Sequence, residues 1–259
     1  MSAHDSLAIK RNRRRVVLLG ASNLTMGLAT VVQATRRLWT EPLDIFAACG
    51  HGRSYGAESS FVVRRLPAIL QCGLWQQLEA SPAVPTRALV TDVGNDIVYG
   101  FAAGQILAWV DEAATRLARV SDDVVITNLP IEGLRSVSPR KFHFVRSVFF
   151  PGCRLSQEEV LATAERVNAG LEQVATRHRA RFVHLSPSWY GFDPIHIAPS
   201  RWQDAWQEIL GVCSPFQPSH LEAVRLYLTR PELQWLCGVE QRAPQTGTRL
   251  RRGARVWLY

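Results

Sequence analysis

An acid stands three residues before a histidine in the segment Asp193-Pro194-Ile195-His196. In so short a turn, both side chains can lie on the same side of the chain. The carboxylate can then hold one ring nitrogen of the histidine and leave the other free to take a proton. Asp193 and His196 therefore offer the base and its orienting group of a Ser-His-Asp site. Such a site also needs a nucleophile and donors for an oxyanion.

Ser22 is the candidate nucleophile. It follows a short apolar segment, residues 15–20, and precedes apolar residues at helical spacing. A serine hydroxyl attacks well only when a base removes its proton. At a helix start it also lies near free backbone N–H groups and the positive end of the helix dipole. The alternative is that Ser22 only caps the helix.

Gly52 and Asn95 are the candidate oxyanion donors, together with the backbone N–H of Ser22. Gly52 lacks a Cβ, so a substrate can approach its N–H, and Asn95 offers a side-chain amide. Gly50 and Gly56 are alternatives to Gly52. Asn95 could instead begin a turn and a helix cap.

Strands and helices alternate along the chain, which predicts βαβ units and a parallel sheet covered on both faces. Each candidate residue follows an expected strand, so the carboxyl edge of that sheet would bring them together. A helix is expected around residues 61–70, and the segment 131–156 is expected to be an irregular insertion or lid. After residue 211, short helices are expected at 221–228 and 231–236, then a terminal strand or docked tail. The expected strands cover residues 15–20, 43–48, 87–93, 123–127 and 181–185.

The segments Gly20-Ala21-Ser22-Asn23, the Gly52 loop, Gly94-Asn95-Asp96 and Asp193-Pro194-Ile195-His196 resemble, in order and spacing, the four sequence blocks of the SGNH (GDSL-type) hydrolases. The resemblance covers residues 16 to about 211. Two positions depart from the family pattern. Ala21 stands where the family usually has Asp, which removes no catalytic group. Val93 replaces the first glycine of the third block, in the loop that carries Asn95.

This resemblance implies a three-layer α/β/α fold with a five-stranded parallel, flavodoxin-like sheet, to which the C-terminal residues add a helical extension. It implies that Ser22 is the nucleophile, His196 the base and Asp193 its orienting group. The oxyanion hole would be the Ser22 N–H, Gly52 and Asn95. Members hydrolyse esters, thioesters and O-acetyl groups, usually without a metal. We therefore expect an esterase or acyl hydrolase acting on a small-molecule or carbohydrate ester.

Length and composition set further limits. A chain of 259 residues with 47% hydrophobic and 20% charged residues is typical of one soluble globular unit. We expect residues 1–211 to form the hydrolase domain, with a basic segment 1–14, and residues 212–259 to pack on or beside it. No apolar run reaches the ~20 residues of a membrane span.

The cysteines and histidines suggest neither a disulfide framework nor a metal site. Five cysteines are scattered without a Cys-x-x-Cys pair, which favours reduced thiols in the cytoplasm. The basic run at 10–15 followed by apolar residues is similar to the start of a signal peptide, but polar residues interrupt it soon and no cleavage motif follows. No metal or cofactor is expected.

The net charge of +8 is concentrated at the two ends of the chain. We interpret these ends as solvated, because no nucleic-acid-binding signature accompanies them; the oligomeric state is open. The sequence is compatible with two other functions. The segment Gly50–Gly56 resembles a phosphate-binding loop of a nucleotide- or dinucleotide-binding protein, although it follows the second strand. The fold could also serve as a non-catalytic binding module.

Two features near the expected site have alternative interpretations. Arg53 could pair with an anionic substrate group, but a solvent-facing side chain is favoured. The aromatic residues at 142–150 could line an acyl pocket, although packing in a core or lid is favoured.

Overall fold

The computed structural model describes residues 13–39, 42–150, 152–191, 193–214 and 219–259. Most of the basic segment 1–14, and residues 10–12 of the run compared with a signal peptide, lie outside these residues. The α-helices are α2 (Ser22–Leu38), α3 (Leu74–Ala80), α4 (Asn95–Val98), α5 (Ala103–Ala118), α6 (Ile131–Arg135), α7 (Pro139–Phe149), α8 (Gln157–Arg177), α9 (Trp202–Leu210) and α10 (His220–Leu228). Short 3-10 turns lie at Ile69–Gln71, Pro187–Trp189, Pro199–Arg201 and Arg251–Gly253.

Two sheets are present. The strands are β1 (Arg14–Leu19), β2 (Leu43–Ala48), β3 (Ser59–Phe61), β4 (Arg64–Leu66), β5 (Thr86–Val90), β6 (Asp123–Thr127), β7 (Arg181–Val183), β8 (Leu233–Leu236), β9 (Val239–Arg242), β10 (Thr248–Arg249) and β11 (Arg255–Leu258). The large sheet has the order β10-β11-β2-β1-β5-β6-β7, and the small sheet has the order β3-β4-β8-β9.

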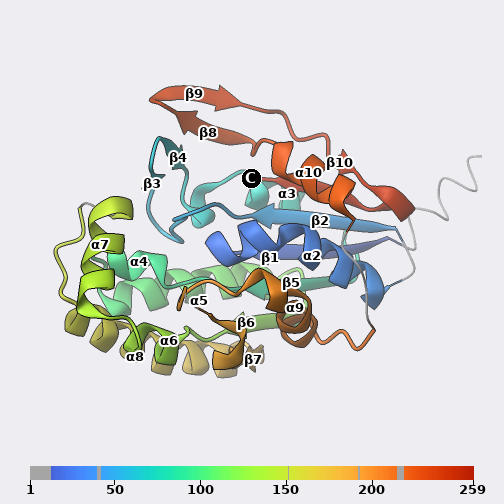
Figure 1. Cartoon of the computed structure of the whole chain (residues 1–259). Coiled ribbons are helices and arrows are strands. Elements are labelled where there is room, and N and C mark those ends of the chain that lie inside the picture. The colour runs from blue at the N-terminus through green and yellow to red at the C-terminus, as the bar shows by residue number, and fades with distance from the viewer. Residues whose placement is uncertain (1–12, 40–41, 151, 192, 215–218) are drawn as a thin grey trace, which may run out of the picture.

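The five expected strands form the parallel centre of the large sheet in the flavodoxin-like order β2-β1-β5-β6-β7. Strand β1 is apolar from Val16 to Leu19 because both of its faces are covered there. Val17 and Leu19 face a core built with α3, α5 and α8, whereas Val16 and Leu18 face a core built with α2 and α9. The expected α/β/α layering is therefore confirmed (Figure 1).

The expected strand count and the expected helical extension are wrong in detail. The sheet has seven strands, because β11 pairs in parallel with β2 and β10 pairs antiparallel with β11. The apolar segment Val256-Trp257-Leu258 thereby covers the edge of β2, which would otherwise be open. Figure 1 shows this C-terminal strand beside β2. The domain boundary expected at residue 211 stays a prediction.

Two expected helices are strands instead. Residues 61–66 form the β3–β4 hairpin, and β8 occupies most of the segment 231–236. Strand β4 pairs with β8, which lies far along the chain. This long-range pairing makes both segments strands instead of helices. Pro67 also disfavours helix at the residue before it. In the segment 131–156, α6 and α7 replace the expected irregular chain.

Within the described ranges, none of the helices combines the length and apolar composition that crossing a bilayer requires. All five cysteines are free thiols.

The contact between α2 and α9 gives a test of the fold. A Cβ at Gly27 would come within 2.2 Å of Nε1 of Trp206, which is fully buried. We expect Gly27→Ala to lower the free energy of unfolding by ~1–3 kcal/mol, because the extra methyl overfills this contact. Chemical denaturation measures the change.

Gly104→Ala, in α5, is the matched control, because a Cβ there meets nothing within 4 Å. Its free energy of unfolding should stay the same or rise by up to ~1 kcal/mol, since alanine favours helix. Equal effects of the two substitutions would contradict the described packing.

Candidate active site

Ser22 is the first residue of α2, directly beyond the carboxyl end of β1. The N-cap residue is Ala21, and no side chain caps the helix from that position. The Ser22 hydroxyl is instead within hydrogen-bond distance of the ring of His196, with 2.9 Å between Oγ and Nε2. The capping alternative for Ser22 is therefore wrong.

Asp193 and His196 meet as the spacing suggests. Oδ2 of Asp193 lies 2.7 Å from Nδ1 of His196, and Oδ1 accepts hydrogen bonds from the backbone N–H groups of Ile195 and His196. Partial burial acts to raise the pKa of Asp193, but these hydrogen bonds and the nearby imidazole hold it below its usual value. The carboxylate thus stays ionised and orients the ring toward Ser22.

Asp92 fixes the start of α2 to the end of β5. Its carboxylate accepts hydrogen bonds from the backbone N–H of Ala21 at 3.0 Å and of Leu24 at 2.9 Å, and from the amide of Asn23 at 2.9 Å. Its own backbone has a φ of 58°, a left-handed conformation in which aspartate is enriched among non-glycine residues. A carboxylate at a helix N-terminus also interacts favourably with the helix dipole.

Asn23 connects α2 to the loop that carries His196. Its amide donates to the carbonyl of Ile195 at 3.1 Å, and its Oδ1 accepts from the N–H of Ile197 at 2.8 Å. These two bonds hold the backbone on both sides of His196. On the far side, the Ile197 carbonyl accepts from Nε1 of Trp202. The position of the imidazole over Ser22 is therefore set by neighbouring backbone as well as by Asp193.

The proposed oxyanion donors lie around the same cavity. Gly52 and Asn95 both line it, whereas Gly50 and Gly56 do not. A Cβ at Gly50 would collide with Leu66, and one at Gly56 would collide with Trp109, so these two glycines permit close packing. Gly52 has a φ of 66°, which favours glycine. Among the three, the geometry singles out Gly52 as the residue able to face a substrate.

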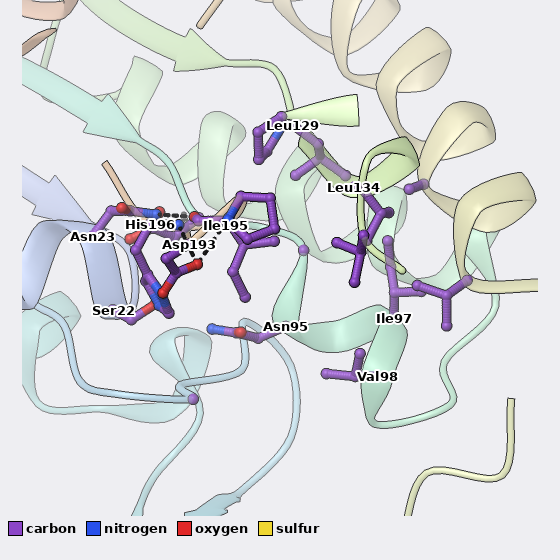
Figure 2. A pocket seen from close by; sticks show the side chains of 18 of the residues that line it. Ser22, Asn23, Asn95, Ile97, Val98, Leu129, Leu134, Asp193, Ile195 and His196 are labelled. Carbon is purple, nitrogen blue, oxygen red and sulfur yellow. Dashed lines mark hydrogen bonds and ion pairs between the residues drawn. The ribbon is translucent and has the colours of Figure 1, made fainter. Parts of the chain in front are cut away.

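Asn95 begins α4 and lies across the cavity from α2. Figure 2 shows its side chain directed toward Ser22. Its amide nitrogen is 3.5 Å from the carbonyl oxygen of Arg53, and a hydrogen bond of this length is weak. Asp92 accepts from Ala21 and Leu24 but from no donor on the Ser22 backbone. Ser22, Gly52 and Asn95 all line the cavity in front of the Ser22 hydroxyl.

Asp96 holds the loop that carries Gly52. Its buried carboxylate accepts hydrogen bonds from the hydroxyl of Ser54 and from the N–H of Tyr55. Burial raises the pKa of Asp96 to about 6, although both hydrogen bonds act in the opposite direction. The hydroxyl of Tyr99 donates to the Gly52 carbonyl at 2.7 Å. The proposed oxyanion loop is therefore fixed from the α4 side.

Arg53 does not face solvent, and that expectation is wrong. Its side chain is fully buried and donates to the carbonyls of Cys49, Pro67 and Tyr259. It therefore does not meet a substrate but joins the loop to β11 and the segment after β4.

The cavity in front of Ser22 has a volume of about 410 Å³. Most of its polar residues lie close to Ser22, in the histidine loop, the Gly52 loop and the strand ends. The rest of its lining is mainly apolar and extends between α4, α6, α7 and α8, where Lys141 and Arg146 of α7 also border it. Figure 2 shows Ile97, Val98 and Leu134 on the side of Asn95 that is remote from Ser22. The site is thus a polar reaction centre that opens into an apolar pocket.

Sequence reasoning missed Asp92 and the role of Asn23. A signal for Asp92 exists, since it stands directly after a strand end at the point where the strand order reverses. His51 lines the cavity and stacks on Phe61 with ring centroids 5.6 Å apart. Burial lowers its pKa, and the nearby Arg64 and His196 lower it further.

The structure does not support the phosphate-loop interpretation of residues 50–56. The Gly50–Gly56 segment runs into strand β3 rather than into a helix, so it has no helix N-terminus to hold a phosphate. In the described part of the chain, no three histidine, cysteine or acidic side chains form a cluster suited to a metal ion.

Neither the protein-family models nor the curated proteins include a match to this chain. Solved structures do match. A carbohydrate acetylesterase family member from Sinorhizobium meliloti is 14% identical, with 83% of this chain and 99% of that chain covered and a TM-score of 0.50. A lipolytic protein G-D-S-L family member from Veillonella parvula is 11% identical, with 78% and 100% covered and a TM-score of 0.49. The M. smegmatis aryl esterase is 12% identical, with 77% and 100% covered and a TM-score of 0.49.

Identities this low make the likeness one of fold. The Sinorhizobium meliloti protein matches over most of both chains, and the expected α/β/α fold is confirmed.

The bridge made by Asn23 gives a test of how the imidazole is placed. We expect Asn23→Ala to lower kcat for a nitrophenyl ester by roughly 10- to 100-fold, because a small displacement of the base from Ser22 costs rate. KM should change little, since Asn23 holds the loop rather than the substrate. Steady-state kinetics separates the two parameters.

Gln33→Ala is the matched control, because Gln33 lies on the same helix and donates to Glu222, away from the cavity. Its kcat should stay at the wild-type value. A wild-type kcat in a folded Asn23→Ala variant would contradict the bridging role.

Proposed function

We propose that this chain is a serine hydrolase that cleaves an ester, thioester or O-acetyl group through an acyl-enzyme intermediate. The proposal rests chiefly on one observation, the continuous hydrogen-bonded series from the Ser22 hydroxyl through the His196 ring to Asp193. This series opens on a cavity large enough for a small-molecule substrate.

In the first step, Oγ of Ser22 attacks the substrate carbonyl carbon while its proton passes to Nε2 of His196. The carbonyl oxygen becomes an oxyanion. The Ser22 N–H, the Gly52 N–H and the Asn95 amide are the donors that would stabilise it. Asp193 fixes the tautomer of the ring and stabilises the imidazolium that forms.

In the second step, the bond from carbon to the leaving oxygen or sulfur breaks, and His196 returns its proton to the leaving group. A water molecule then attacks the acyl-enzyme. Its proton goes to His196 as its oxygen bonds to carbon, and collapse of this intermediate returns the proton to Ser22 and releases the acid. The proposal needs no metal or cofactor.

Removing the nucleophile should abolish turnover. We expect Ser22→Ala to reduce kcat for nitrophenyl acetate by roughly 10⁴-fold or more, since no other group can form the acyl-enzyme. Circular dichroism should show an intact fold, because the Ser22 hydroxyl contributes no helix cap.

The matched control is Ser188→Ala, an exposed serine in the Pro187–Trp189 turn before the His196 loop. It should retain wild-type kcat. Wild-type turnover in Ser22→Ala would remove Ser22 as the nucleophile.

The amide of Asn95 should act mainly in the transition state. We expect Asn95→Ala to lower kcat by ~10²–10³-fold with a smaller effect on KM, because the oxyanion forms only during reaction.

Asn128→Ala provides the comparison, because Asn128 lines the same cavity but its Oδ1 accepts from the N–H of Leu185. Its loss of kcat should be much smaller. Equal losses in the two variants would mean that Asn95 is no oxyanion donor.

A further inference from the structure

The cavity continues beyond the reaction centre as a separate apolar region. We define this apolar arm by six of the side chains that line it: Ile97 and Val98 of α4, Ile131 and Leu134 of α6, Phe142 of α7 and Val160 of α8. On α7, Lys141 and Arg146 also line the cavity and are the polar residues of this helix that border it. The arm therefore offers dispersion contacts and release of water, and few hydrogen bonds.

The arm begins on the oxyanion side of the site. Asn95 is followed on the same short helix by Ile97 and Val98, which are arm residues. In Figure 2, Ile97, Val98 and Leu134 lie on the side of Asn95 that points away from Ser22 and His196. The leaving group must remain beside His196, because that ring protonates it. The portion of the substrate that enters the arm is then the acyl portion.

Helix α7 supplies part of the arm and is held in place by specific contacts. Phe142 and Phe150 line the cavity. The Phe150 ring meets Tyr99 edge to face with centroids 5.6 Å apart. Arg146, which also borders the cavity, donates to the carbonyl of Leu155 at 2.8 Å. The opposite side of α7 exposes Phe144 and Val148, which are not in the cavity lining.

The volume of the cavity limits the length of the acyl chain that a substrate can place in it. A methylene group is comparable in size to a water molecule, whose share of liquid volume is about 30 Å³. The volume of about 410 Å³ belongs to the whole cavity, reaction centre included, so the arm has room for several methylene groups besides the ester group. An acetyl group would leave most of the apolar lining without a contact.

We infer that the preferred substrate carries a medium-length, unbranched fatty acyl chain, which lies in the apolar arm while Ser22 attacks its carbonyl carbon. This inference rests on the proposed hydrolase function and narrows it, because an acetyl donor or a sugar in the arm would not use the arm's lining. The alcohol or thiol portion leaves on the His196 side.

A chain-length series tests the inference. With nitrophenyl esters from acetyl to dodecanoyl, kcat/KM should rise about fourfold for each added methylene and level off once the arm is full. Acetates of increasingly long alcohols should show no such rise. A steady fall from acetyl upward, or a rise only in the alcohol series, would overturn the inference while leaving the hydrolase function intact.

A variant that fills the arm sharpens the test. Leu134→Trp should lower kcat/KM for the octanoyl ester at least about tenfold more than it lowers kcat/KM for the acetyl ester. Val148→Trp, on the exposed side of α7, is the matched control and should change neither. If Leu134→Trp does not fold, Ile131→Trp fills the same arm. Equal losses on both esters in a folded arm variant would contradict the inference.

Direct binding separates failure of the inference from failure of the proposed function. Calorimetry with decanoate on Ser22→Ala measures the arm without turnover. Saturable binding that Leu134→Trp abolishes in the same background supports the arm even if no ester is hydrolysed. Absence of decanoate binding to folded Ser22→Ala would overturn it even if acetate esters are cleaved.

Discussion

The carboxylate of Asp92 joins the end of β5 to the start of α2, and most of the site depends on that junction. It accepts from two backbone N–H groups and from the amide of Asn23, which in turn holds the backbone on both sides of His196. The end of β5, helix α2 and the loop that carries His196 are thus connected through the carboxylate of Asp92 and the amide of Asn23. Because these contacts lie beside a rigid parallel sheet, the distance between Ser22 and His196 is set before any substrate binds.

Asp96, four residues later, makes the corresponding connection on the other side of the cavity. It connects the glycine loop after β2 to α4 and thereby fixes the position of Gly52 relative to Asn95. One short segment after β5 therefore organises both the nucleophile and the proposed oxyanion donors. The strand order explains why: β1 and β5 are neighbours at the point where the order reverses, and a cleft opens at such a point.

Sequence reasoning succeeded where local pattern and topology agree. Buried strands such as β1 and long amphipathic helices such as α8 have strong hydrophobic patterns in the sequence. The carboxyl ends of parallel strands lie at the same edge of the sheet, and this brings Ser22, Asn95 and His196 together. It failed where distant segments decide the structure. The β3–β4 hairpin and β8 need each other, β11 needs the edge of β2, and Arg53 is buried because β11 and the segment after β4 supply its acceptors. Asp92 and Asn23 were missed because their partners are about 70 to 170 residues away.

The most direct measurement is the identity of the residue that a fluorophosphonate modifies. The reagent reacts with a serine whose proton a neighbouring base can remove and whose oxyanion is stabilised, which are the properties ascribed to Ser22. Peptide mapping by mass spectrometry should place a single adduct on Ser22, and its formation should slow sharply when His196 is replaced. An adduct on a different side chain, or no adduct on the folded protein, would contradict the account.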